Sequence, residues 1–107
     1  MIDWPRVKEL KDEIGQDDFG EVVELFLEEV EEIINKLRGD DRSQLEQDLH
    51  FLKGCALNLG FGSFSKLCLQ GERQAAEGGA DQVDLPAILD MFEASKHSFL
   101  TELPNQG

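Results

Sequence analysis

Residues 18–38 read DFGEVVELFLEEVEEIINKLR, and this stretch decides the fold of the 107-residue chain. Apolar side chains recur along it every three or four positions, which is the spacing of one face of an α-helix: Phe19, Val22, Val23, Phe26, Val30, Ile33, Ile34 and Leu37. The opposite face predicts a solvated acidic surface made by Glu21, Glu24, Glu28, Glu31 and Glu32. Asp17 or Asp18 can cap this helix, and Gly39 can end it. A helix of this kind must bury its apolar face against other elements, so it predicts a helical core.

Four further segments show the same periodicity, and they predict helices over 3–14, 43–60, 63–77 and 85–102. No segment alternates apolar and polar residues as a strand would. The prolines fall near the ends of these helices, where a missing N–H does least harm: Pro5, Pro86 and Pro104. We therefore predict an all-α fold, an antiparallel up-down four-helix bundle with a short additional N-terminal helix, in one domain over residues 1–107.

Charge and composition exclude several classes of protein. With 23 acidic and 10 basic residues the net charge is −13, which argues against non-specific binding of nucleic acid and against anionic membrane surfaces. No apolar run approaches the roughly 18–20 residues of a membrane span, and residues 1–10 lack the apolar region of a secretory signal. Cys55 and Cys68 fit neither a disulfide framework nor a CxxC motif. We expect a cytoplasmic monomer, with Cys68 in the core and Cys55 on a more exposed flank, where a redox role stays open.

The segment 43–60 becomes informative when its helical phase is worked out. Its core stripe consists of Leu45, Leu49, Leu52, Ala56 and Leu59. Since each residue advances about 100° around a helix, His50 points about 140° away from the centre of that stripe and Lys53 about 80°. Gly54 lies at about 180°, Leu57 near 120° and Phe61 near 160° by the same arithmetic. A histidine, a glycine and two apolar side chains are thus expected on the outward side, with Lys53 on the flank that His50 shares.

Folding alone does not explain this outward set. A glycine in an exposed helix interior costs about 1 kcal/mol relative to alanine, but Gly54 would let another molecule come close to His50. Residues 49–71 contain no acidic residue in an otherwise acidic chain, although they contain Lys53 and Lys66. Neutral imidazole is a nucleophile near pH 7, and a lysine ammonium suits phosphate oxygens. From the residues alone, an anion-handling site and an incidental surface histidine both remain open.

The stretch His50-Phe51-Leu52-Lys53-Gly54, followed by Gly60, resembles the H-x-L-K-G-x5-G signature of histidine-containing phosphotransfer (HPt) domains. Other positions along nearly the whole chain fit the same family pattern, among them Phe26, Leu67 and Glu72. The sequence departs from the pattern at Leu49, where a small residue is usual, and at Cys55, where a serine is usual. Glu72 stands where some members have a polar side chain near the histidine.

The resemblance implies a role in two-component phosphorelays. His50 would accept a phosphoryl group from the aspartyl phosphate of one receiver domain, through Nε2, and pass it to the aspartate of another. Lys53 would stabilise the phosphoryl group, Gly54 would leave room for it, and Gly60 would close the helix. The implied partners are receiver domains of a hybrid histidine kinase, a response regulator, or both. Gly54, Leu57, Gly60 and Phe61 are the expected binding residues.

Neither a Walker loop nor a glycine-rich nucleotide loop is present, so we expect no ATP binding and no autonomous kinase or ATPase activity. We expect no resident cofactor, with Mg²⁺ supplied by the partner receiver. The pairs Glu46/His50 and Glu93/His97 have helical spacing but face outward, so no metal site is expected. The alternative function is a non-phosphorylated adaptor bundle that docks a receiver or a partner helix through Leu57 and Phe61.

Overall fold

The computed structural model describes residues 2–103, and Pro104 therefore lies outside the described residues. The helices are α1 (Trp4–Ile14), α2 (Gln16–Arg38), α3 (Leu45–Leu59), α4 (Gly62–Ala76) and α5 (Leu85–Glu102), with a short 3-10 helix, η1 (Ala80–Gln82), before α5. The all-α prediction is confirmed, and each helix begins and ends within two residues of its expected bounds. None of the helices among residues 2–103 is long and apolar enough to cross a bilayer.

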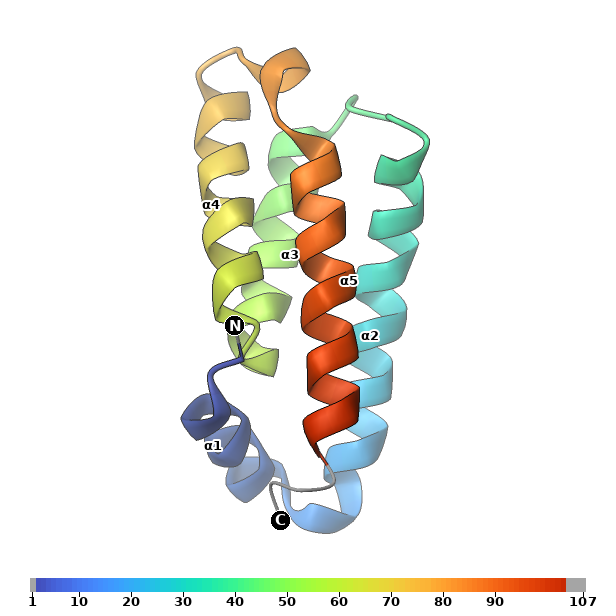
Figure 1. Cartoon of the computed structure of the whole chain (residues 1–107), viewed down its shortest axis with the longest axis vertical. Helices are drawn as coiled ribbons and strands as arrows, with labels where there is room; N and C mark the ends of the chain where they lie inside the picture. Colours follow the sequence, from blue (N-terminus) through green and yellow to red (C-terminus); the bar gives the residue numbers. More distant parts are fainter. Residues whose placement is uncertain (1, 104–107) are drawn as a thin grey trace.

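The four long helices stand side by side and run alternately up and down, as Figure 1 shows. Each packs against its neighbours along the chain, and α5 also packs against α2, so the bundle closes on itself. The short α1 lies across one end, where it contacts α2 and α3 (Figure 1). This arrangement leaves one outward face on each long helix.

Local sequence explains where α1 and α5 begin. Both start with an aspartate followed two residues later by proline, which suits the first turn of a helix. The Asp3 carboxylate accepts a hydrogen bond from the Arg6 amide at 3.3 Å, and Asp84 accepts one from the Ala87 amide at 3.1 Å. At α2 the expected aspartate cap is wrong, because the helix begins two residues earlier and Gly15 is its N-cap. Asp17 and Asp18 lie instead in its first turn, where they complement the helix dipole.

Aromatic side chains fill the centre of the bundle. Phe61, Phe64, Phe92 and Phe99 are all fully buried, and their ring centroids lie 5.4 to 6.5 Å apart along the cluster. Burying each such side chain stabilises the fold by about 1.5–3 kcal/mol. Trp4 stacks on Phe99 at 5.8 Å, which anchors α1 to the bundle.

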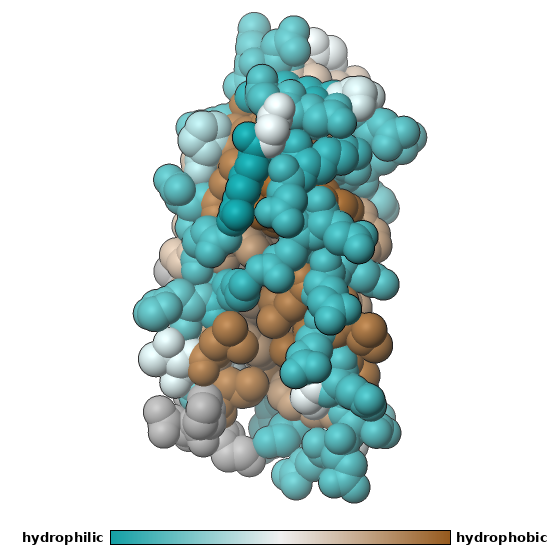
Figure 2. All heavy atoms as spheres, turned by 90° about the vertical axis from the view of Figure 1, so that its right-hand side faces the viewer, coloured by the Kyte–Doolittle hydropathy of each residue, from teal (hydrophilic) through white to brown (hydrophobic). Residues whose placement is uncertain are grey.

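The side of the bundle on which α2 lies is largely hydrophilic, with hydrophobic patches mostly in its lower half, as Figure 2 shows. The expected solvated glutamate face is confirmed, and only Glu31 of that set is partly buried. Lys96 pairs with Glu31 and Arg38 pairs with Glu93, so both ion pairs connect α2 to α5. Exposed pairs of this kind contribute little to stability but suit a surface in contact with water.

Two expectations about exposure are wrong. Phe61, expected on the outward side, is only 1% exposed, because α3 ends at Leu59 and Gly60 adopts a left-handed φ of 77°. The helical phase therefore does not extend to Phe61, whose ring turns inward toward Phe99. Cys55 is also buried, because α3 packs against both α2 and α4 and its buried sector is wider than the leucine stripe. Burial raises the pKa of the Cys55 thiol, which favours its protonated form.

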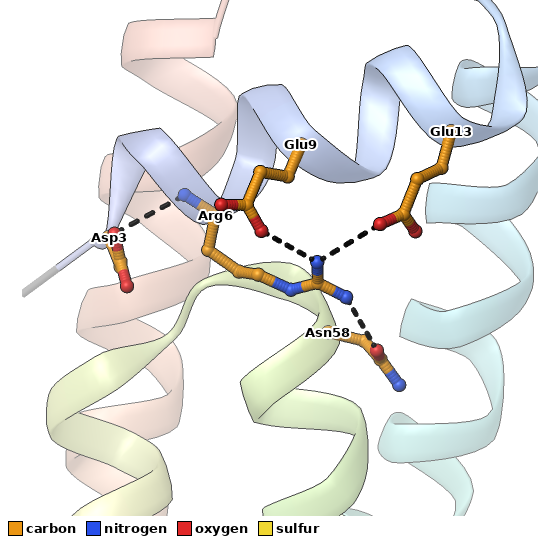
Figure 3. A network of polar contacts seen from close by, with 5 residues as sticks. All are labelled: Asp3, Arg6, Glu9, Glu13 and Asn58. Carbon is orange, nitrogen blue, oxygen red and sulfur yellow. Dashed lines mark hydrogen bonds and ion pairs between the residues drawn. The ribbon is translucent and has the colours of Figure 1, made fainter.

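Gly60 allows the N-terminal segment to pack closely against the bundle. The Asp3 amide donates a hydrogen bond to the Gly60 carbonyl oxygen at 2.6 Å, and a Cβ at Gly60 would lie 2.7 Å from the Asp3 carbonyl oxygen. Figure 3 shows the polar contacts beside this junction, where the Arg6 guanidinium donates to Asn58 of α3 at 3.1 Å. Gly60, expected among the binding residues, is thus buried in a packing position under α1.

Replacing Gly60 with alanine should lower the free energy of unfolding by about 2 kcal/mol, because φ is positive and the added methyl group meets the backbone. Urea denaturation followed by circular dichroism measures this loss. Gly78→Ala is the matched control, since Gly78 has a φ of 87° but open space around it. Equal losses of unfolding free energy in the two variants would show that the packing of α1 does not depend on Gly60.

Replacing Ser95 with alanine should raise the free energy of unfolding by about 1 kcal/mol, because its buried hydroxyl has no hydrogen-bond partner among the described residues. Ser65→Ala is the control, since that buried hydroxyl donates to the Gly62 carbonyl oxygen at 2.8 Å and its loss should destabilise. The same denaturation assay applies, and a loss of stability in Ser95→Ala would contradict the argument.

Candidate functional site

His50 lies on the outward face of α3, with 69% of its side chain exposed. Its neighbours Leu49 and Leu52 are completely buried, so the leucine stripe fixes the direction in which the imidazole points. The exposure predicted from helical phase is confirmed. Because the backbone around His50 is held by the core, the ring is presented to solvent from a rigid helix.

Glu72 of α4 connects the imidazole to Lys53. The Glu72 carboxylate lies 2.9 Å from Nδ1 of His50 through one oxygen, and its other oxygen accepts a hydrogen bond from the Lys53 ammonium at 2.8 Å. Lys53 and Glu72 are mostly covered, at 22% and 19% exposure of their side chains. The three residues form one polar cluster, which we call the His50 cluster.

The charge of Glu72 decides which ring nitrogen carries the proton. The hydrogen bond from Lys53 lowers the pKa of Glu72 most, burial opposes it, and the hydrogen bond with His50 lowers it further. Glu72 is therefore ionised at neutral pH and can only accept, so Nδ1 of the neutral ring is the donor. The lone pair of the imidazole then resides on Nε2, the nitrogen on the opposite side of the ring from Glu72.

This depressed pKa also gives the pH range over which the cluster supports folding. A carboxyl whose pKa is lower in the folded state stabilises the protein above its unfolded pKa. That contribution is lost as the pH falls through the pKa that Glu72 has in the folded state. The effect is modest because the cluster lies at the surface, where solvent screens its charges.

Close packing of α3 and α4 brings Glu72 to the imidazole. Gly71 faces the core, and a Cβ there would lie 2.8 Å from the Cδ1 atom of Leu49. The absence of a side chain at Gly71 therefore lets Leu49 of α3 reach the backbone of α4. Glu72 is the next residue, and His50 follows Leu49, so the contact that packs the two helices also aligns the cluster.

An ion pair with a buried carboxylate restrains the other side of α3. The Lys36 ammonium of α2 lies 2.7 Å from the carboxylate of Asp48, which is only 8% exposed. The Asp48 carboxylate raises the pKa of Lys36, so the ammonium stays charged at neutral pH. α3 is thus held by charge toward α2 and by apolar packing toward α4, which restrains rotation of the helix that carries His50.

Open apolar surface adjoins the cluster. Gly54 is exposed, and a Cβ added there would have nothing within 4 Å. Leu57 is 55% exposed and Phe51 is 40% exposed, both on α3. We call the exposed surface of His50, Phe51, Gly54 and Leu57 the α3 face. Phe61 does not belong to it, because its ring is in the core.

The histidine and acid pairs with helical spacing do not converge on a metal-binding arrangement. Across residues 2–103, no group of three or more histidine, cysteine, aspartate or glutamate side chains could hold a metal ion. His97 of α5 is exposed. The acid beside His50 is Glu72, already in contact with Lys53.

For Glu72, the family resemblance indicates a place near the histidine, but not the contacts that this residue makes with His50 and Lys53. Its position after the acid-free segment 49–71 is a weak signal, since it is the first acid to follow the site. The sequence does not say that α4 approaches α3 closely enough for Glu72 to reach two residues of another helix.

Comparison with protein families gives one match in keeping with this geometry. The family model described as Hpt domain matches residues 21–98, a span that contains most of α2, all of α3 and α4, and most of α5. Comparison with curated proteins gives no match, and comparison with solved structures gives none. Hpt domains are phosphotransfer carriers of two-component phosphorelays, and they interact with receiver domains. Because the match covers well over half of the chain and includes the whole His50 cluster, the chain belongs to the Hpt domain family.

Proposed function

We propose that His50 is the phosphoacceptor of this domain, taking a phosphoryl group from the aspartyl phosphate of one receiver and passing it to the aspartate of another. The observation that carries the proposal is an exposed imidazole whose Nδ1 is held by a carboxylate and whose Nε2 is left as the nucleophile. An ammonium group from Lys53 stands in the same cluster.

The proposed transfer needs little chemistry from this chain. The lone pair of Nε2 forms the N–P bond while the P–O bond of the acyl phosphate breaks, and that electron pair leaves with the receiver's carboxylate. The Nδ1 proton stays on the ring. Such transfers depend mainly on positioning and charge stabilisation. We expect Lys53 to offset the negative charge of the phosphoryl oxygens.

We propose that any divalent cation comes with the receiver. Glu72 is the carboxylate in contact with His50, and both of its oxygens are already engaged by His50 and Lys53. This donor set does not fit a resident Mg²⁺ site. We accordingly propose a carrier without kinase or ATPase activity of its own, as is general for Hpt domains.

The α3 face supports docking of a receiver. Gly54 leaves open space beside the imidazole, and the apolar side chains of Phe51 and Leu57 offer surface that a partner can bury. The acid-free segment 49–71 reduces the negative charge near the site in a chain of net charge −13, and the charge of Glu72 is offset by Lys53. An anionic acyl phosphate can therefore approach with less repulsion than elsewhere on this surface.

A non-phosphorylated adaptor bundle is the second candidate, because exposed Leu57 next to open Gly54 would serve docking alone. That function would give the His50 cluster no role. Incubation with a phosphorylated receiver and Mg²⁺ separates the two candidates. A label on the protein that is stable to base and labile to acid indicates phosphohistidine, whereas a complex without label indicates the adaptor.

His50→Gln should abolish this labelling, because the amide has no nucleophilic ring nitrogen, while the helix content stays unchanged. His97→Gln is the control, since it removes the exposed histidine of α5 and leaves the His50 cluster intact. Labelling is measured with a radioactive phosphorylated receiver, and folding by circular dichroism. Full labelling of His50→Gln would overturn the assignment.

Gly54→Gln should stabilise the helix by about 0.5 kcal/mol, since glutamine has the higher helix propensity, and weaken receiver binding at least several-fold by filling the α3 face. Gly20→Gln is the control on α2, because Gly20 is also exposed with open space around its Cβ position. Calorimetric titration with a receiver and thermal melting test both effects. Unchanged affinity in Gly54→Gln would remove Gly54 from the docking surface.

A further inference from the structure

A cavity of about 550 Å³ lies at the end of the bundle that α1 covers. Its walls come from α1, from Gln16 at the start of α2 and from Leu103, the residue that follows α5, and we call it the α1 cavity. Small-molecule sites in proteins measure about 300–1,000 Å³, whereas two other hollows in this surface measure only about 290 and 210 Å³. Among residues 2–103, none from α3 or α4 lines the α1 cavity, so it is separate from the His50 cluster.

Part of the lining of the α1 cavity is apolar. Trp4 and Leu103 are partly buried and Val7 is buried, and all three line the cavity. The indole of Trp4 stacks on the ring of Phe99 with an angle of only 6° between the two planes, so its position is fixed. An aromatic ring that enters the cavity gains both from the removal of apolar surface from water and from packing on indole. This part of the lining therefore favours a ligand with a flat aromatic body.

Two lysine side chains add positive charge to the cavity. Lys8 and Lys11 are three residues apart on α1, so they lie on one face of that helix. Neither ammonium group takes part in an ion pair with a carboxylate of residues 2–103. Two carboxylates of the same helix, Glu9 and Glu13, contact Arg6 instead, as Figure 3 shows. The charge of the two lysines is thus directed at the cavity and is not neutralised by the acids of α1 that pair with Arg6.

The balance of charge in the lining indicates the charge of the ligand. The Lys11 ammonium lies 6.0 Å from the centroid of the Phe19 ring, a cation–π contact that restrains the side chain without neutralising it. Asp12 is the one acidic side chain among the described lining residues, so positive charge exceeds negative charge by one. A ligand with a single negative charge matches this excess.

We propose that the α1 cavity binds a small aromatic molecule that carries one carboxylate group. The ring system packs against Trp4, Val7 and Leu103. The carboxylate accepts hydrogen bonds from the ammonium groups of Lys8 and Lys11, which are charge-assisted and set the orientation of the ligand. Because the chain has a net charge of −13, an anion gains attraction here from local charge and not from the protein as a whole.

The first experiment compares two probes of nearly the same shape, the anion 2-naphthoate and the neutral 2-naphthamide. Titration of the nitrogen-15-labelled protein, followed through its amide chemical shifts, gives the Kd and the place of binding together. We expect saturable shifts that are largest at residues 4–16 and at Leu103. We expect 2-naphthoate to bind about five-fold more tightly than 2-naphthamide, the size expected from two partly exposed charge contacts.

The second experiment changes the protein. The double variant Lys8→Gln and Lys11→Gln removes both positive charges and keeps side chains that suit a helix. Its matched control is the double variant Lys66→Gln and Arg73→Gln, because both residues are exposed on α4 and also lie outside the ion pairs of residues 2–103. The two double variants change the net charge by the same amount. We expect the Kd for 2-naphthoate to rise about five-fold in the first and to equal the wild-type value in the second.

Nuclear Overhauser contacts then locate the probe. Contacts from the naphthyl protons to the indole of Trp4 and the methyl groups of Leu103 would support the proposal. Contacts to Phe51 or Leu57 would place the probe on the exposed α3 face and overturn it. Equal affinities for the two probes, the absence of saturable shifts, or an equal rise of the Kd in both double variants would also overturn it, since each removes the selection of an anion by this cavity.

Discussion

The close approach of α3 and α4 at Leu49 and Gly71 is the constraint on which the site depends. A Cβ at Gly71 would lie 2.8 Å from a methyl carbon of Leu49, so the two helices pack at this separation only because Gly71 has no side chain. The residues that follow these two in sequence, His50 and Glu72, are thereby brought within hydrogen-bonding distance. A contact in the apolar core thus determines the geometry of a polar cluster on the surface, since the packing of rigid helices leaves little freedom for adjustment.

The two sides of α3 have different roles: one side restrains the helix, and the other carries the His50 cluster. Toward α2, the buried carboxylate of Asp48 pairs with the partly exposed Lys36 and restrains the helix. Toward α4, the His50 cluster is exposed at its imidazole and covered at its other members. A carrier in a phosphorelay has to present the same nitrogen to two different partners, so it benefits from a ring whose orientation is set from within its own domain.

Sequence reasoning predicted most of the fold because helical periodicity is a local property. It also placed His50 outward, since the leucines on either side define the phase of α3. It failed at Phe61, because phase arithmetic holds only while the helix continues, and the left-handed Gly60 ends it. It failed at Cys55, because a helix packed on two sides buries more than one stripe. The contacts of Glu72 were beyond its reach, since they depend on the distance between two helices and on side-chain rotamers.

The stacking of Trp4 on Phe99 has a practical consequence. Trp4 is the chain's single tryptophan, and the chain has no tyrosine, so its ultraviolet-excited emission comes almost entirely from this one indole ring. The ring packs 5.8 Å from Phe99 near the end of α5, and α1 is joined to α3 by the hydrogen bond from the Asp3 amide to the Gly60 carbonyl oxygen. Fluorescence therefore reports on the packing of α1 against the bundle, whereas circular dichroism reports on all the helices together. The protein carries a built-in optical probe that can distinguish detachment of its N-terminal helix from unfolding of the bundle.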